Sequence, residues 1–273
     1  MKTLPTCRAL SLALALGAPT LSFAQGGAYT VQGKFGSKDI ANVYLRSVTG
    51  ATTKLDSAAV RGGRFTLKGT VAEPTAAYLF TAKAHKDFRK SPQQGLTLYL
   101  EPGTIRISSP DSLLHATAGG TPLNITNTRL VAATKAPDER MRKLMAEYRA
   151  ATPAQRQDKA FEARIDQQSD AIRAERKPLL IQFIKENPQS IVSLAALKDL
   201  GGYAIDPAEV GPLYDGLAPA VRQNREGQAY GARIEKTRRL ALGAPAPDFT
   251  QSDPTGKPVK LSDFRGKYVL VDF

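Results

Sequence analysis

The chain has 273 residues, and its 38 lysines and arginines outnumber 25 aspartates and glutamates, which gives a formal net charge of +13. One cysteine and two histidines exclude a disulfide framework and a zinc–thiolate site. The basic residues are dispersed and lack the interleaved aromatics used in single-strand nucleic-acid binding, so we expect no metal, no cofactor and no nucleic-acid partner. The charge predicts a solvated basic surface, with weak attraction to anionic lipid or acidic partners as the alternative.

The amino terminus has the pattern of a secretory signal peptide. Basic residues precede an apolar stretch from Ala9 to Phe23, which ends in the small-x-small cleavage site Ser22-Phe23-Ala24. This stretch is shorter than the roughly 20 residues that a spanning helix needs. We expect cleavage of residues 1–24 after Ala24, loss of Cys7 with the signal, and export to the periplasm or cell envelope without a transmembrane segment.

Residues 25–128 consist of short alternating segments bounded by Gly, Pro, Asp and Ser, which predict an antiparallel β-sandwich of Greek-key or immunoglobulin-like type. Arg61-Gly62-Gly63-Arg64 predicts a hairpin turn, because glycine accepts the positive φ of tight turns, and Pro102-Gly103 predicts a second turn. The expected strands are Tyr29–Phe35, Asn42–Val48, Ala58–Val60, Arg64–Lys68, Ala77–Ala82, Leu96–Leu100 and Thr104–Ser108. The aromatic residues expected in the sandwich core are Tyr44, Phe65, Tyr78, Phe80 and Tyr99.

The pattern becomes helical after Thr128, so residues 129–242 are expected to form a helical connector. Thr152-Pro153-Ala154-Gln155 combines an N-cap, a proline in the first turn and a glutamine three residues after the cap. It predicts a long helix to about Lys185, kinked or interrupted at Pro178. The other expected helices are Arg140–Ala150, Ile191–Leu200 closed by Gly201-Gly202, one from Asp206 towards Gly216, and one over about Gly227–Leu242.

Residues 243–273 are rich in turn signals and end in a strand pattern. The segment from Tyr268 to Phe273 is apolar except for Asp272, which is typical of strands in sheets covered on both faces. Roughly thirty residues cannot bury a core of their own. We therefore expect residues 243–273 to be the first part of an incomplete domain.

Three motifs of this tail, in order, resemble the opening of a thioredoxin-like domain of the TlpA/ResA and peroxiredoxin (AhpC/TSA) superfamily. They are Gly243-Ala244-Pro245-Ala246-Pro247-Asp248-Phe249, the stretch from Gly256 to Lys267, and Val269-Leu270-Val271-Asp272-Phe273. In that family the sequence continues with Trp-Ala-x-Trp-Cys-x-x-Cys. The resemblance therefore implies an exported thiol-disulfide oxidoreductase whose catalytic cysteines are absent from this chain. Without these cysteines, the 273 residues should have no oxidoreductase activity. It also implies that the partners are protein thiols and disulfides of the envelope, with a membrane protein as a possible electron donor.

The region from Tyr29 to about Asn127 resembles the small β-sandwich domain of unknown function that precedes thioredoxin-like domains in some envelope proteins. The segments that carry this second resemblance are Tyr44-Leu45-Arg46, Gly63-Arg64-Phe65-Thr66, Leu100-Glu101-Pro102-Gly103 and Gly120-Thr121-Pro122-Leu123-Asn124. Together, the two resemblances imply an α+β multidomain chain. A sandwich and a helical connector would be followed by the first strands of a truncated thioredoxin-like fold.

Asp272 is the one residue of the implied redox site that the chain contains. The resemblance implies that it lies beneath the Cys-x-x-Cys pair and relays a proton to or from the buried thiol. Burial between Val271 and Phe273 would favour the protonated form and suit it to acid–base work. An aspartate that faces water at the end of a strand is the alternative. Neither His85 nor His115 lies in a cluster of Asp, Glu or Cys residues at metal spacing, so each is expected to be a satisfied or exposed histidine rather than a ligand.

Two other functions stay open. A peroxiredoxin-type peroxidase shares the first two tail motifs, but that family usually carries an apolar residue at the position of Asp272. A non-enzymatic envelope adaptor would use the sandwich and helices to recognise a partner, without redox chemistry. The residues that follow Phe273 in the coding sequence would separate the three functions.

Overall fold

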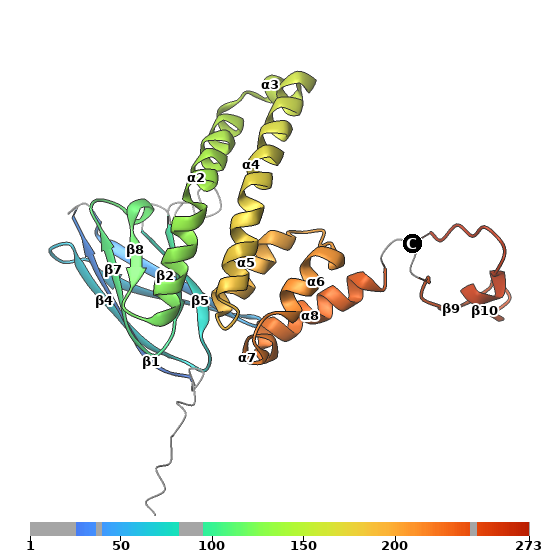
Figure 1. The fold of residues 1–273 in the computed structure, drawn as a ribbon, viewed down its shortest axis with the longest axis horizontal. Coiled ribbons are helices and arrows are strands. Elements are labelled where there is room, and N and C mark those ends of the chain that lie inside the picture. Colours follow the sequence, from blue (N-terminus) through green and yellow to red (C-terminus); the bar gives the residue numbers. More distant parts are fainter. Residues whose placement is uncertain (1–25, 37–39, 82–94, 241–244, 273) are drawn as a thin grey trace, which may run out of the picture.

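The computed structural model describes residues 26–36, 40–81, 95–240 and 245–272. The expected signal peptide, Cys7 and His85 lie outside the described residues. Two sheets precede a set of helices, so the mixed strand and helix content of the prediction is confirmed (Figure 1). Among the described residues, no helix is both long enough and apolar enough to cross a membrane.

Two four-stranded sheets, with strand orders β4-β1-β7-β8 and β3-β2-β5-β6, make up the first part of the fold. All pairs of neighbouring strands are antiparallel except β1 and β7, which run parallel. The expectation of a purely antiparallel sandwich was therefore wrong at this pair. The strands are β1 (Gly27–Phe35), β2 (Asn42–Thr49), β3 (Thr52–Ala59), β4 (Arg64–Val71), β5 (Thr75–Thr81), β6 (Gly95–Leu100), β7 (Gly103–Ser109) and β8 (Thr117–Gly119).

A single hydrophobic core joins the two sheets in a sandwich-like arrangement. Strand alternation places Val31 and Ile105 of one sheet and Leu79 of the other in this core, each fully buried. The predicted turn after β3 is confirmed: Gly62 and Gly63 have φ angles of 57° and 74°. The backbones of Arg61 and Arg64 exchange two hydrogen bonds of 2.9 and 3.0 Å across it.

Of the aromatic residues expected in the sandwich core, only Phe65 lies there. Tyr44 lies opposite Phe80 in the register of β2 and β5, one position away from the core pair Leu45 and Leu79, so both rings are on the outer face. Tyr78 and Tyr44 each stack on Phe80, with ring centroids 6.0 and 5.6 Å apart. Tyr99 is buried in the helical core instead. The strand period was predicted correctly, but not that a second layer would cover the outer face.

The helices form two further cores. Leu144, Ile165 and Ile172 pack between the two longest helices, α2 and α4, which project side by side from the body (Figure 1). The larger core gathers side chains from α4 to α8 around Leu194 and Leu197 and includes Tyr99 of β6. The helices are α2 (Pro122–Ala150), α3 (Pro153–Gln157), α4 (Lys159–Glu186), α5 (Ile191–Gly201), α6 (Pro207–Asp215), α7 (Pro219–Gln223) and α8 (Arg225–Arg238).

Two of the predicted helices have different bounds. The helix expected over Arg140–Ala150 is the second half of α2, which contains Pro137 and crosses the expected domain boundary at residue 128. The capping box at Thr152 is confirmed, but the helix that follows ends at Gln157. Asp158 then caps α4, because its carboxylate accepts the backbone N–H groups of Ala160 and Phe161. Pro178 lies inside α4 without ending it.

The tail forms a small hairpin of β9 (Thr250–Ser252) and β10 (Pro258–Lys260), followed by a 3₁₀ turn over Leu261–Phe264. Residues 265–272 form no strand, and the side chains of Tyr268 and Leu270 are almost completely exposed. The buried strand expected over Tyr268–Phe273 is therefore absent from its described part. No described strand pairs with this segment, and Val269 and Val271 are only partly covered, with exposed fractions of 44% and 38%.

Candidate functional site

The structure brings two of the three tail motifs into direct contact. The carboxylate of Asp248, in the first motif, accepts the backbone N–H and the hydroxyl of Ser262, in the second motif, each at 2.9 Å. The backbone N–H of Leu261 also donates to the carbonyl of Phe249 at 3.0 Å. The hydrogen bonds from the Ser262 N–H and hydroxyl lower the pKa of Asp248 below its ordinary value. These contacts join segments that lie 14 residues apart in the chain.

Asp272 lies beside the joined motifs. It lines an open hollow of about 330 Å³ together with apolar side chains of the tail. The apolar residues of this hollow are Phe249, Val259, Leu261, Phe264, Val269, Leu270 and Val271. Asp272 itself is exposed. Two carboxylates of the tail thus differ in role: Asp248 is held by hydrogen bonds, whereas Asp272 faces solvent at the rim of an uncovered apolar surface.

A second hollow, of about 470 Å³, lies among α2, α4, α5 and α6 and is lined by charged residues. Arg176 binds Asp138 and Asp199 at 2.6 Å each, and Lys177 binds Glu209 at 2.6 Å. Arg173 also lines the hollow, so three cations face the three carboxylates and the charges balance within it. This arrangement holds α4 against its neighbours and leaves little net field for an ionic ligand.

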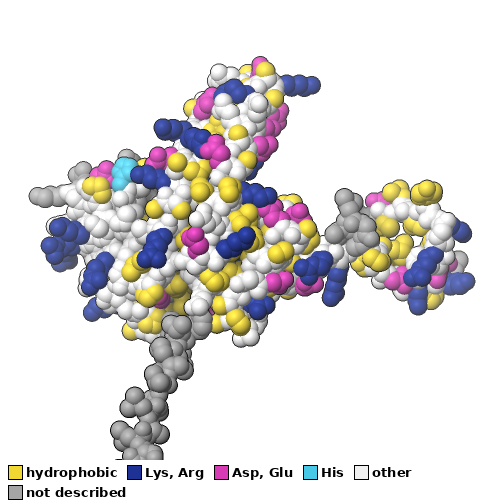
Figure 2. Space-filling view, viewed as in Figure 1, with side chains coloured by type: hydrophobic (Ala, Val, Ile, Leu, Met, Phe, Trp, Pro, Cys, Tyr) yellow, Lys and Arg dark blue, Asp and Glu magenta, His cyan; other side chains and the backbone are white. Residues whose placement is uncertain are grey.

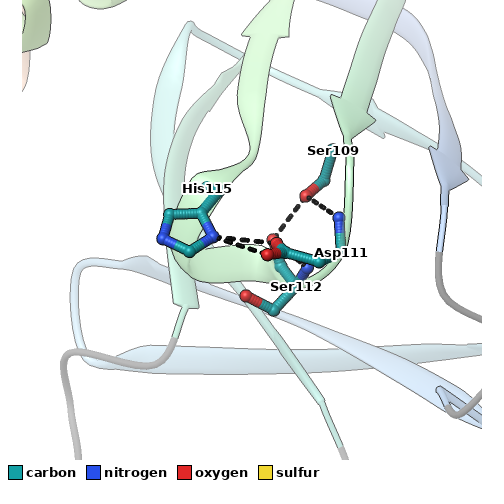
Figure 3. A network of polar contacts seen from close by, with 4 residues as sticks. All are labelled: Ser109, Asp111, Ser112 and His115. Carbon is teal, nitrogen blue, oxygen red and sulfur yellow. Dashed lines mark hydrogen bonds and ion pairs between the residues drawn. The ribbon is translucent and has the colours of Figure 1, made fainter.

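His115 takes part in a polar network at the end of β7 (Figure 3). Its Nδ1 lies 2.8 and 2.9 Å from the two carboxylate oxygens of Asp111. The bond from His115, followed by that from the Ser112 N–H, lowers the pKa of Asp111. The hydroxyl of Ser109 donates to the Ser112 carbonyl at 2.5 Å and accepts the Asp111 N–H at 3.3 Å.

Ser109, Asp111 and His115 do not form a catalytic triad. The hydroxyl of Ser109 is engaged with backbone groups of the turn, while His115 binds only the acid. The network closes the turn between β7 and the short 3₁₀ helix at Leu113–His115. In the part of the chain that the structure describes, no three His, Cys, Asp or Glu side chains group as ligands for a metal.

Sequence reasoning missed the buried polar cluster at the start of α2. Asn124 is fully buried and bonds to the backbone of Tyr99, and the nearly buried carboxylate of Glu101 accepts the N–H of Leu123 at 2.8 Å. Glu101 thus binds an otherwise free N–H of the first turn of α2, because the hydroxyl of the N-cap Thr121 accepts the side-chain amide of Asn124 at 2.8 Å and caps no backbone N–H. The motifs around Glu101 and Asn124 indicate a family resemblance, but their sequence gives no sign that these side chains meet.

Residues 29–126 match the family described as "Domain of unknown function (DUF4369)". The match covers the sandwich-like part and the first turn of α2. No curated protein matches the chain, and no solved structure matches it either. The matched segment has about the extent that the second resemblance gave, from Tyr29 to about Asn127.

Proposed function

We propose that this chain carries the accessory part and the opening of the catalytic domain of an exported thiol-disulfide oxidoreductase of TlpA/ResA type. The observation that carries the proposal is the pair of hydrogen bonds between Asp248 and Ser262. It ties two of the three tail motifs into one folded unit directly before the apolar segment that holds Asp272. A DUF4369 domain at residues 29–126 agrees with an envelope protein in which a thioredoxin-like domain follows.

The apolar surface of the tail supports the same proposal. Val269, Leu270 and Val271 form a run of exposed apolar residues, and such runs mark surfaces that another element covers. A central strand of a thioredoxin-like sheet at this position would be covered by helices on both faces. Asp272 would then change from an exposed to a buried carboxylate.

The proposed chemistry requires a Cys-x-x-Cys pair that the printed sequence does not contain. The first cysteine, as thiolate, attacks a substrate disulfide and forms a mixed disulfide, and one substrate sulfur leaves as a thiolate. The second cysteine then loses its proton to Asp272 and attacks the mixed disulfide. This releases the reduced substrate and leaves the two enzyme cysteines as a disulfide. Two electrons pass from enzyme to substrate, and a membrane donor would reduce the enzyme again.

Asp272 favours disulfide exchange over a peroxidase. Peroxide reduction by a single cysteine needs no carboxylate under the active site, whereas a two-cysteine exchange needs a proton acceptor for the second thiol. Export agrees with this chemistry, because disulfides form and persist in oxidising compartments.

The proposal is tested on the gene product that extends beyond Phe273 in the reading frame. We expect it to contain Cys-x-x-Cys shortly after this residue and to catalyse the reduction of insulin disulfides. Protein that comprises residues 25–273 serves as the control and should show no activity, because it has no thiolate. A reading frame without the cysteine pair, or an extended protein that does not reduce insulin, would overturn the proposal.

A further inference from the structure

The outer face of the sheet β4-β1-β7-β8 carries four basic residues: Lys34 on β1, Arg64 and Lys68 on β4, and Arg106 on β7. In the register of the sheet, Lys34 lies opposite Arg64, and Gln32 lies between Thr66 and Arg106. All four basic side chains belong to exposed residues, while their neighbours in sequence point into the core. We call this surface the basic face.

The remaining strand residues of the basic face are small or neutral and polar. Neither an acidic residue nor a large apolar one is among them in the described strands. These residues are Ala28, Thr30, Gln32, Thr66, Thr70, Thr104, Ser108, Thr117 and Gly119. Figure 2 shows dark blue side chains spread over this side of the molecule. The face is therefore basic throughout, with hydroxyl and amide groups between the charges.

The cations of the basic face also lack the ion pairs that several helix cations of this protein make. Arg140, Arg164 and Arg176, for example, each bind a carboxylate on another helix. In the described part of the chain, no carboxylate lies within ion-pair distance of Lys34, Arg64, Lys68 or Arg106. Like charges directly opposite on neighbouring strands, such as Lys34 and Arg64, are destabilising. The repulsion between these charges contributes nothing to the stability of the fold, but it would be relieved by an anionic partner bound to the face.

We propose that the basic face docks on the surface of a membrane rich in anionic phospholipid. Four charges on three adjacent strands, about 4.8 Å apart, present a broad array rather than a pocket. Lysine and arginine attract lipid phosphates, and the threonine and glutamine side chains between them can donate hydrogen bonds to phosphate oxygens. The proposal does not depend on the thiol chemistry.

Two features favour a lipid surface over a macromolecular partner. Stable protein interfaces have an apolar core with a polar rim, and the basic face has no large apolar residue to form such a core. Single-stranded nucleic acid is bound with aromatic side chains that stack on the bases, and the strand residues of this face include no outward aromatic. Lipid headgroups require neither feature.

The test compares binding of residues 25–273, and of two variants, to vesicles by co-sedimentation. The vesicles contain either phosphatidylcholine alone or about one third phosphatidylglycerol. The first variant is Lys34→Gln/Lys68→Gln. The control is Lys143→Gln/Lys185→Gln, which removes two exposed lysines from α2 and α4 and causes the same change in net charge. Circular dichroism melts check that both variants fold.

We expect wild type to bind the anionic vesicles and not the neutral ones, with binding that weakens as salt rises from about 0.05 to 0.5 M. Each cation removed from the face should weaken binding about fivefold, so the face variant should lose about 25-fold and the control much less. Equal losses in both variants would show that net charge alone acts and would overturn the proposal. Binding to duplex DNA or polyglutamate as tight as to the anionic vesicles would also overturn it.

Discussion

The side-chain amide of Asn124 takes the place of a neighbouring strand for Tyr99. The backbone N–H of Tyr99 donates to Oδ1 of Asn124 at 2.9 Å, and Nδ2 of Asn124 donates to the carbonyl of Tyr99 at 2.7 Å. One turn further along α2, Nδ2 of Asn127 donates to the carbonyl of Thr97 at 3.3 Å. Because β6 is an edge strand, these bonds satisfy backbone groups that would otherwise be open to another chain. The first turn of α2 is therefore bonded to the sheet of the DUF4369 domain, in agreement with the end of the family match at residue 126.

Replacing Asn124 with Leu should destabilise the protein strongly. The change leaves both backbone groups of Tyr99 buried and unpaired, and each such group costs about 1–3 kcal/mol. We expect the free energy of unfolding in urea to fall by about 2–5 kcal/mol. Thr126→Ala is the control, because its hydroxyl only bonds within α2 and is exposed, and it should change stability by less than about 0.5 kcal/mol. A leucine variant as stable as this control would contradict the role given to Asn124.

Arg176→Met should loosen the contact among α2, α4 and α5. Arg176 binds Asp138 and Asp199 on two different helices, but both acids are partly exposed, so screening limits the loss to about 1 kcal/mol. Arg173→Met is the matched control on the same helix, since Arg173 binds only Asp170, three residues before it. Equal unfolding midpoints in urea for the two variants would show that the three-helix contact adds nothing.

The pKa of Asp111 should report on His115. The bond to His115 lowers the pKa of this carboxyl, so the pair stabilises the fold above the ordinary aspartate value of about 3.9. That contribution is lost as the pH falls through the lowered pKa. His115→Ala should move the pKa of Asp111 upward, as measured by carboxyl chemical shifts in an NMR titration. An unchanged value would mean that the Ser112 N–H alone holds the carboxylate.

Limited proteolysis should remove the tail before it cuts the sheets or the long helices. Residues 245–272 are mostly exposed, and their hydrogen bonds are made within the tail. We expect a resistant core that ends near Leu242 and loses Gly243–Phe273 first. Mass spectrometry of the fragments identifies the cuts. Protection of the Val269–Val271 amides from hydrogen exchange at the level of β1 would instead show that this segment is paired and packed.

Local signals in the sequence predicted most of the strands and the helix N-caps Thr152 and Asp206, but not the N-caps Asp158, Ser190 and Asn224. Gly62 and Gly63, Thr152 and Asp206 each determine a turn or a helix start within a few residues, and the structure has these features. The short strand β8 and the first half of α2 were missed. β8 has only three residues, too few for a strand pattern. The first half of α2 has no apolar helical period, because its buried residues include two asparagines that bond to the distant strand β6. Such contacts depend on tertiary structure and leave no periodic pattern.

The candidate site was predictable only in part, for the same reason. The tail motifs were recognised from their order, but nothing in the sequence showed that Asp248 and Ser262 bind each other. The apolar pattern at Val269–Val271 indicates that the segment can form a β-strand when another strand is present to pair with it. Without a pairing strand, the same residues are exposed.

The most direct test of the proposed redox function is the rate of disulfide exchange in the extended protein and in its Asp272→Asn variant near pH 7. Asparagine keeps the shape of the side chain but cannot accept the proton of the second cysteine, so exchange should slow about tenfold or more. The variant should fold at least as stably, because a buried charge is removed. No exchange by the wild-type protein, or equal rates for both proteins between about pH 6 and pH 8, would contradict the account.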